Sequence, residues 1–134
     1  MKKKKPKSNS TNKATSQKIA EITPNARMAK EAPLAIVVCG DMRNESNDLV
    51  REFWVQDASA ATQNILLAAH AMELGAVWTG TYPAQNRCEA ISQLLNLPSS
   101  IIPFSTIVIG YPKETQQPKD KWKEENISYE VFGE

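Results

Sequence analysis

The sequence predicts one domain of mixed α and β structure, in which helices cover both faces of a small sheet. Two runs rich in β-branched residues, 34–39 and 104–109, predict buried strands, and a long run of helix-forming residues lies between them. Apolar residues make up 41% of the 134 residues, which is enough for a globular core. No apolar run approaches the roughly 20 residues that a membrane-spanning helix needs, so we expect no membrane partner.

The first 18 residues contain seven lysines and no acidic residue, whereas residues 19–134 carry a net charge of −6. This composition predicts a disordered lysine-rich tail over 1–18, followed by the domain over 19–134. A nucleic-acid-binding arm is the alternative, but no arginine or aromatic residue is interleaved there to stack on bases. We therefore do not expect nucleic acid as a partner.

The elements before the long helix are predicted in order. Residues 18–31 are weakly helical and are interrupted at Thr23, after which Pro24 is suited to start a second short helix. The run 34–39, bounded by Pro33 and Gly40, predicts a central strand that is covered on both faces.

A long helix is predicted over 57–74, with Asp57 as its N-cap and Gly75 closing it in the left-handed conformation. Its apolar residues surround nearly the whole helix, which places it inside the fold or in an interface. His70 is the only histidine, and in such a helix we expect it to be a hydrogen-bonded structural residue and not a base or ligand.

A further helix is predicted to open at a capping box formed by Asn86 and Glu89 and to end before Pro98. Its inner face carries Ile91, Leu94 and Leu95. After the strand at 104–109 the chain is charged and extended. Apolar side chains in this last part need a surface to cover, such as a second subunit; they are Trp122, Ile127, Tyr129 and Phe132.

Common catalytic and metal-binding motifs are absent from the sequence. Cys39 and Cys88 lack metal-ligand spacing and are expected to be reduced cysteines of a cytoplasmic protein, with a disulfide as the less favoured alternative. No histidine is placed by sequence to activate Ser59 or Ser105, so a hydrolase is not supported. If the chain is an enzyme, a cofactor is expected to carry its chemistry.

Five segments occur in the order found in one family of flavin enzymes. They are LAIVVCGD (34–41), the helix with its glycine (57–75), VWTGTYP (77–83), LLNLP (94–98) and VIGYP (108–112). Each is weak alone, but the ordered set resembles the nitroreductase family over residues 20–134. The resemblance implies an α+β fold, an α-β-α sandwich that binds FMN at a homodimer interface. It also implies reduction of nitro compounds, quinones or similar small-molecule acceptors by NADH or NADPH.

The resemblance also implies which residues bind the cofactor. Trp78, Thr79 and Gly80 would form a turn after the long helix and donate backbone N–H groups to the flavin ring. Lys121, with Lys119 as its neighbour, would pair with the FMN phosphate. The alternative for the turn is a plain helix-to-strand connection with a core tryptophan. The alternative for the two lysines is a solvated charged segment.

The sequence departs from the family at its start, where members carry an arginine-rich phosphate-binding segment and this sequence has its lysine-rich tract. It therefore resembles an N-terminally truncated member. An FMN-dependent oxidoreductase is the favoured function. The alternatives are a non-enzymatic truncated protein with weak or no FMN binding, and a small interaction domain whose basic tail binds an anionic partner.

Overall fold

The computed structural model describes residues 10–43, 47–115 and 117–133. Its described strands form one antiparallel sheet in the order β1-β3-β2. The strands are β1 (Leu34–Asp41), β2 (Gly75–Gly80) and β3 (Ile101–Gly110).

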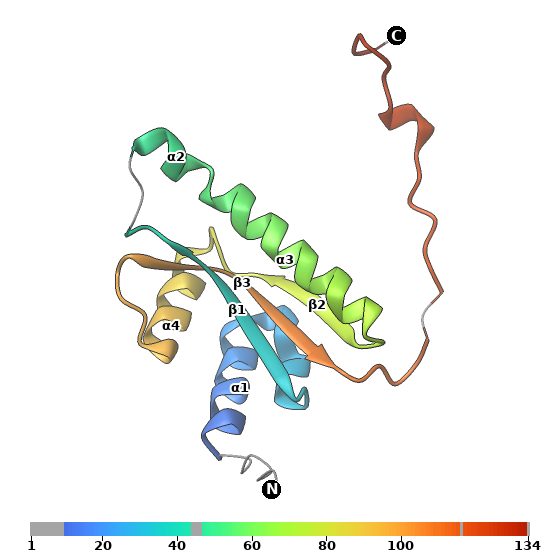
Figure 1. Cartoon of the computed structure of the whole chain (residues 1–134). Coiled ribbons are helices and arrows are strands. Elements are labelled where there is room, and N and C mark those ends of the chain that lie inside the picture. The colour runs from blue at the N-terminus through green and yellow to red at the C-terminus, as the bar shows by residue number, and fades with distance from the viewer. Residues whose placement is uncertain (1–9, 44–46, 116, 134) are drawn as a thin grey trace, which may run out of the picture.

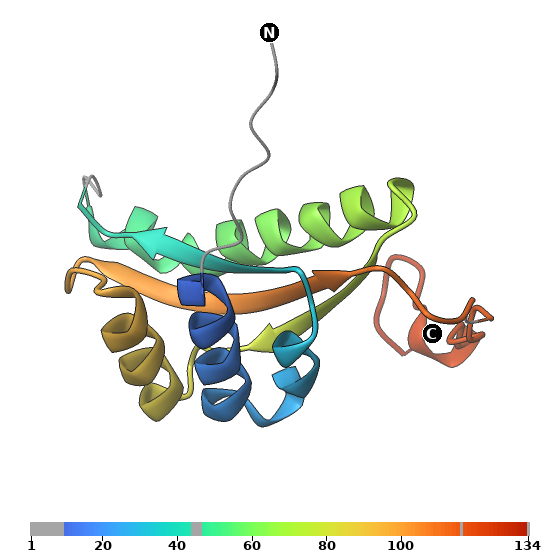
Figure 2. The same cartoon turned by 90° about the horizontal axis from the view of Figure 1, so that it is seen from below.

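Helices cover both faces of this sheet, as the sequence predicts (Figures 1 and 2). One face carries α2 (Asp48–Glu52) and α3 (Trp54–Ala71). The opposite face carries α1 (Ser10–Ile22), the 3₁₀ segment η1 (Pro24–Lys30) and α4 (Gln85–Leu95). The short η2 (Glu124–Asn126) lies in the C-terminal extension, residues 113–115 and 117–133, which runs away from the sheet and helices (Figure 1). None of the helices in the described part of the chain has the length and apolar character of a membrane-spanning segment.

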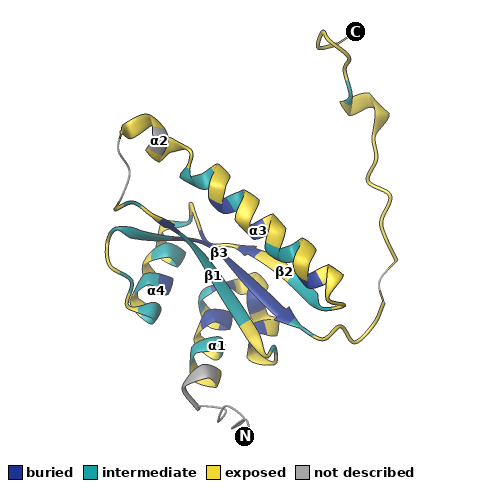
Figure 3. Ribbon diagram, in the orientation of Figure 1, coloured by how far each residue is buried: buried dark blue, intermediate teal, exposed yellow. Residues whose placement is uncertain are grey.

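The central strand is β3, and the prediction that the run beginning at Leu34 is central was wrong. β3 pairs with β1 along one edge and β2 along the other, and seven consecutive residues of it, 103–109, are buried (Figure 3). β1 has the hydrophobic composition of a central strand but lies at an edge, with most of its residues half-buried. A hydrophobic composition indicates that both faces of a strand are covered. It does not indicate how many strands pair with it.

The main core lies between the sheet and the α1, η1 and α4 layer. Ile19, Ala29, Ile91 and Val108 belong to this cluster, and Ile91 is completely buried. Leu94 and Leu95 pack against the same cluster, so the predicted inner face of α4 is confirmed. The helix itself begins at Gln85 with Ala84 as N-cap and no side-chain cap, so the predicted Asn86 capping box is wrong. Instead, the Gln85 side chain donates from Nε2 to Glu89 Oε1 at 3.0 Å.

The N-terminal part of the chain is more ordered than its composition suggests. Helix α1 begins at Ser10, so residues 10–18, which we expected to lie in the disordered tail, are helical. Ile19 and Ala20 on this helix are buried in the core. That packing stabilises the helix, whose own helical propensity is weak. Pro24 begins η1 as predicted. Residues 1–9 lie outside the described residues.

The long helix starts and ends three residues earlier than predicted. Phe53 is its N-cap, and Asp57 lies in the first turn, where a carboxylate favours the helix dipole without capping it. At the other end Glu73 takes the left-handed conformation, with φ of 59°, and Gly75 is the first residue of β2. One face of α3 packs on the sheet through Ala58, Thr62 and Ala69, while the opposite face is exposed (Figure 3). His70 is also exposed. In the single chain, α3 is therefore not buried on all sides and His70 is not on a buried helix face, in contrast to the prediction.

Gly40 in β1 is expected to be needed for the packing of α3. A Cβ at this position would lie 2.4 Å from Cε3 of Trp54 and 2.7 Å from Cε of Met42. The methionine end can move, but the indole ring cannot without disturbing its aromatic neighbours. We predict that Gly40→Ala lowers the free energy of unfolding by about 1–3 kcal/mol, the usual cost of overpacking.

Gly80→Ala is the matched control in urea or thermal unfolding, because no neighbouring atom lies within 4 Å of its Cβ position. Equal stability of the two variants would contradict the close contact between Gly40 and Trp54.

Candidate functional site

Trp78, Thr79 and Gly80 are the last three residues of β2 and not a turn, so that part of the prediction was wrong. They pair with Ile107, Thr106 and Ser105 of β3. In the described part of the chain, β2 has a partner strand along one edge only. Alternate N–H and C=O groups of an edge strand point away from the sheet, so β2 offers a free row of backbone donors and acceptors.

Side-chain hydroxyl groups fix the position of this edge. Thr79 donates from Oγ1 to the carbonyl oxygen of Thr106 at 2.7 Å, and Thr81 Oγ1 lies 3.3 Å from Thr106 Oγ1. All three threonines are buried. A buried hydroxyl that loses its partner costs about 1–3 kcal/mol, so these contacts hold β2 in one register on β3.

The end of β2 at Gly80 is open on its side-chain face. No atom beyond the chain neighbours lies within 4 Å of the position that a Cβ would take at Gly80. The carbonyl oxygen of Gly80 accepts a hydrogen bond from Nη1 of Arg87 at 3.1 Å. Arg87, which sequence reasoning missed, therefore places a positive charge beside the end of β2. Its spacing of seven residues from Gly80 carries no recognisable motif.

Trp78 is 38% exposed and is not a core tryptophan. Its ring lies 5.8 Å from that of Phe104, at an interplanar angle of 55°. The Phe104 ring in turn meets Trp54 at the start of α3, at a centroid distance of 5.9 Å. The three rings form an aromatic row beside the open end of β2.

Lys119 and Lys121 lie in the exposed C-terminal extension, and the structure does not bring them to Trp78, Thr79 and Gly80 within the chain. The chain leaves the sheet after Gly110, which pairs with Gly75 at the far end of β2 from Gly80, and then continues into the extension. The two predicted parts of the site therefore start from opposite ends of the same strand.

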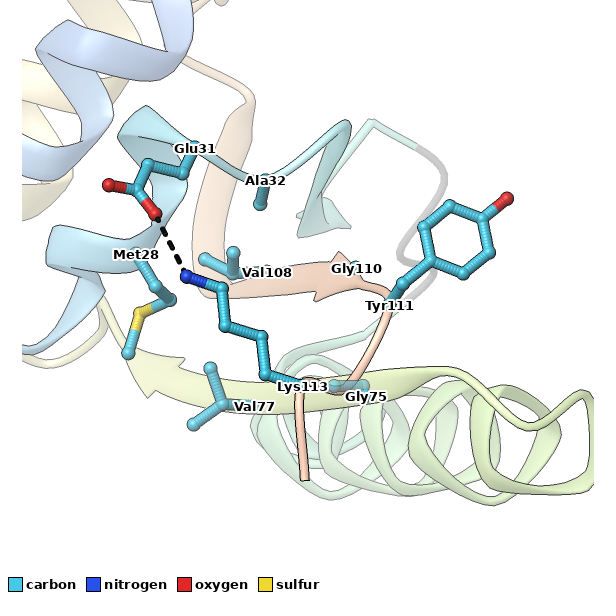
Figure 4. A pocket seen from close by; sticks show the side chains of 10 residues that line it. Met28, Glu31, Ala32, Gly75, Val77, Val108, Gly110, Tyr111 and Lys113 are labelled. Atoms are coloured by element: carbon cyan, nitrogen blue, oxygen red, sulfur yellow. Dashed lines mark ion pairs between the residues drawn. The ribbon is translucent and has the colours of Figure 1, made fainter. Parts of the chain in front are cut away.

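A hollow of about 480 Å³ lies at that far end (Figure 4). Its wall is largely apolar and includes Met28, Val77 and Val108. Lys113 Nζ and Glu31 Oε2 approach to 3.9 Å beside it, but both side chains are exposed, so the ion pair contributes little to stability. None of the five residues that the sequence analysis proposed lines this hollow.

Among the described residues, the remaining reactive side chains form no second catalytic or metal centre. Cys39 and Cys88 are free thiols, and burial raises the pKa of both, so they are protonated at neutral pH. At the end of β1, hydrogen bonds from Arg43 lower the pKa of the exposed Asp41 carboxyl to about 2. The described residues contain no group of three or more histidine, cysteine, aspartate or glutamate side chains that could hold a metal ion.

Comparison with known proteins identifies the family of this chain. The model of the nitroreductase family matches residues 1–111. The chain belongs to the nitroreductase family. It is 47% identical over 121 residues to a protein of Methanothermobacter thermautotrophicus named "Putative NADH dehydrogenase/NAD(P)H nitroreductase", a match that covers 90% of this chain and 62% of the relative. The chain thus spans less than two thirds of that relative's length.

Solved structures confirm the nitroreductase fold. A crystal structure of a protein of the same name from Parabacteroides distasonis has a TM-score of 0.83 and 43% identity, covering 91% of this chain and 70% of that one. An FMN-dependent nitroreductase from Clostridium difficile has a TM-score of 0.78 at 24% identity, covering 90% of this chain and 71% of that one, and shows the fold alone. The family assignment and the α+β sandwich predicted from the sequence are therefore confirmed.

Proposed function

We propose that this chain is an FMN-dependent oxidoreductase that reduces nitro compounds, quinones or similar small acceptors with NADH or NADPH. The observation that carries the proposal is the free edge of β2, which ends in Gly80 with open space over it. A flat ring can approach backbone N–H groups closely only where no side chain intervenes, and Gly80 provides such a place. When bound, FMN would supply the chemistry of accepting a hydride from NAD(P)H and passing electrons to an acceptor.

The chain's own groups are suited to hold the ring and to favour its negative charge. Within Trp78, Thr79 and Gly80, the backbone N–H groups that point away from β3 would donate to the polar edge of the ring. The guanidinium of Arg87, fixed on the Gly80 carbonyl, adds a positive charge nearby. Donors that are already held in place stabilise developing charge without reorganisation, and the threonine contacts to β3 supply that rigidity.

We propose that Lys121, with Lys119 beside it, pairs with the FMN phosphate. Both lysines lie in a segment that leaves the sheet, so they would reach a phosphate only where the extension folds back or lies against a second copy of the chain. Lysine presents a point charge where arginine would present a planar fork, so the phosphate is held with less directional specificity.

We also propose that the functional unit is a homodimer. Leu67 on α3 is 58% exposed, and Met72, directly after this helix, is 69% exposed. On the extension, Trp122, Tyr129 and Phe132 are 72%, 75% and 97% exposed. Exposed apolar side chains on a helix and on an extended segment are typical of a surface that another subunit covers.

The direct test of FMN binding is titration of the purified chain with FMN, monitored by flavin absorbance and fluorescence. We predict that Gly80→Val weakens FMN binding at least about tenfold, roughly 1.4 kcal/mol, because the branched side chain would occupy the space over the strand end. Val is well suited to a strand, and no neighbouring atom opposes it, so the unfolding temperature should stay near that of the parent.

Equal FMN affinity of Gly80→Val and the parent would show that the end of β2 is not the flavin site. If FMN does not bind the parent either, the oxidoreductase proposal itself fails.

Lys121→Ala is predicted to weaken FMN binding about tenfold at low salt, the order of one charge-assisted contact, and much less near 1 M salt. The difference arises because the Debye length falls from about 30 Å at 0.01 M to about 3 Å at 1 M. Lys123→Ala is the matched control, since it removes an exposed lysine from the same segment. If the loss of FMN affinity did not depend on salt, or if it were equal in the two variants, Lys121 would not be a phosphate ligand.

Leu67→Asp is predicted to convert the dimer to a monomer in sedimentation at micromolar concentration, because a carboxylate in an apolar interface loses its hydration without gaining a partner. Leu67 is 58% exposed in the single chain, so the fold should tolerate the change. Gln17→Asp on α1, across the sheet from α3, is the control and should leave the mass unchanged. A parent protein that sediments as a stable monomer would refute the dimer.

A further inference from the structure

A second hollow, of about 420 Å³, lies where β1 ends and β3 begins, against α2 and the first turn of α3. Its wall differs from that of the hollow in Figure 4, because it combines aromatic rings with charged and hydroxyl groups. The side chains that matter are Arg51, Glu52, Trp54, Tyr82, Ser99 and Ser100. Tyr82 is two residues beyond Gly80, so this hollow adjoins the open end of β2.

Trp54 and Tyr82 form a fixed aromatic wall. Their rings meet edge to face, with centroids 4.8 Å apart and an interplanar angle of 73°. The indole ring is supported from behind by Gly40, whose hydrogen leaves just enough room for it, and from the side by Phe104. Such a wall favours a planar aromatic ligand, because it loses little side-chain entropy when the ligand packs against it.

Arg51, at the end of α2, supplies a cation without a carboxylate partner among the described residues. The carboxylate that ends β1, Asp41, is already held by Arg43, with Nε 2.8 Å from Oδ1. Glu52 lines the same hollow and Asp48 lies one turn earlier on α2, but neither forms an ion pair with Arg51 in the described part of the chain. A guanidinium without a carboxylate partner favours binding of a planar carboxylate, because it can donate two parallel hydrogen bonds to it.

We propose that this hollow binds a planar aromatic monocarboxylate, with its ring against Trp54 and Tyr82 and its carboxylate on Arg51. The hydroxyl groups of Ser99 and Ser100 are available to the polar edge of the ligand. Glu52 on the same wall makes a second anionic group unfavourable, which restricts the ligand to one carboxylate. That such a ligand is the electron acceptor rests on the proposed oxidoreductase function, whereas its binding does not.

Calorimetric titration of the full chain with 4-nitrobenzoate and with its neutral analogue 4-nitrobenzamide tests the site. We expect saturable binding of the acid, at least about tenfold tighter than the amide. Arg51→Gln should remove this preference by weakening the acid and leaving the amide unchanged. Arg27→Gln, which removes an exposed arginine from η1 on the other side of the sheet, is the matched control and should retain the preference.

The proposal is overturned if the two ligands bind equally, if neither binds saturably, or if Arg51→Gln keeps the preference while its unfolding temperature matches the parent. The titration needs no flavin, so a chain that fails to bind FMN still gives a decisive result for the hollow. Conversely, where FMN binds and both compounds are reduced, the ratio of kcat/KM for the acid to that for the amide can be measured. If Arg51→Gln does not change this ratio, the oxidoreductase function stands and Arg51 does not select the acceptor.

Discussion

Ser105 and Thr106, neighbours on β3, hold α3 and β2 to the same strand through buried hydroxyl groups. Thr62 of α3 donates from its hydroxyl to the Ala58 carbonyl at 2.8 Å, and Ser105 Oγ lies 2.9 Å from the same hydroxyl oxygen. A hydroxyl has one proton to donate, so both hydrogen bonds form together when Ser105 is the donor to Thr62. Thr106 accepts from Thr79 on the other side. Because these groups are buried, any shift of α3 or β2 along β3 would leave one of them unpaired.

This constraint decides what the edge of β2 can do. A strand that is free on one side would ordinarily be able to slip or pair with another chain. Here the threonine contacts fix its register, so its outward N–H groups occupy definite positions next to the open face of Gly80. The rigidity that a cofactor site needs therefore comes from the interior of the sheet and not from the residues that would touch the cofactor.

Much of the architecture could be predicted from the sequence, because strong local patterns set it. The runs that became β1 and β3, the long helix, the inner face of α4 and the break at Pro24 follow from hydrophobic periodicity and from the chemistry of proline. β2 was missed as a strand because it is short and has a glycine at each end, which resembles a turn when read locally. Its strand conformation is imposed by β3, and a tertiary constraint of this kind leaves little trace in six residues. For the same reason the edge position of β1 and the helical state of residues 10–18 did not follow from composition.

The candidate site was harder to predict than the fold because its contacts belong to the backbone. Backbone donors within Trp78, Thr79 and Gly80 carry no residue-type signal apart from the glycine, and only the ordered set of family segments pointed to this stretch. Arg87 acts through the Gly80 carbonyl and so has no motif of its own. Backbone contacts of this kind can hold a ring without distinguishing among its reaction partners. Selection among acceptors must therefore come from side chains at the rim, where the wall of Arg51, Trp54 and Tyr82 adjoins the end of β2.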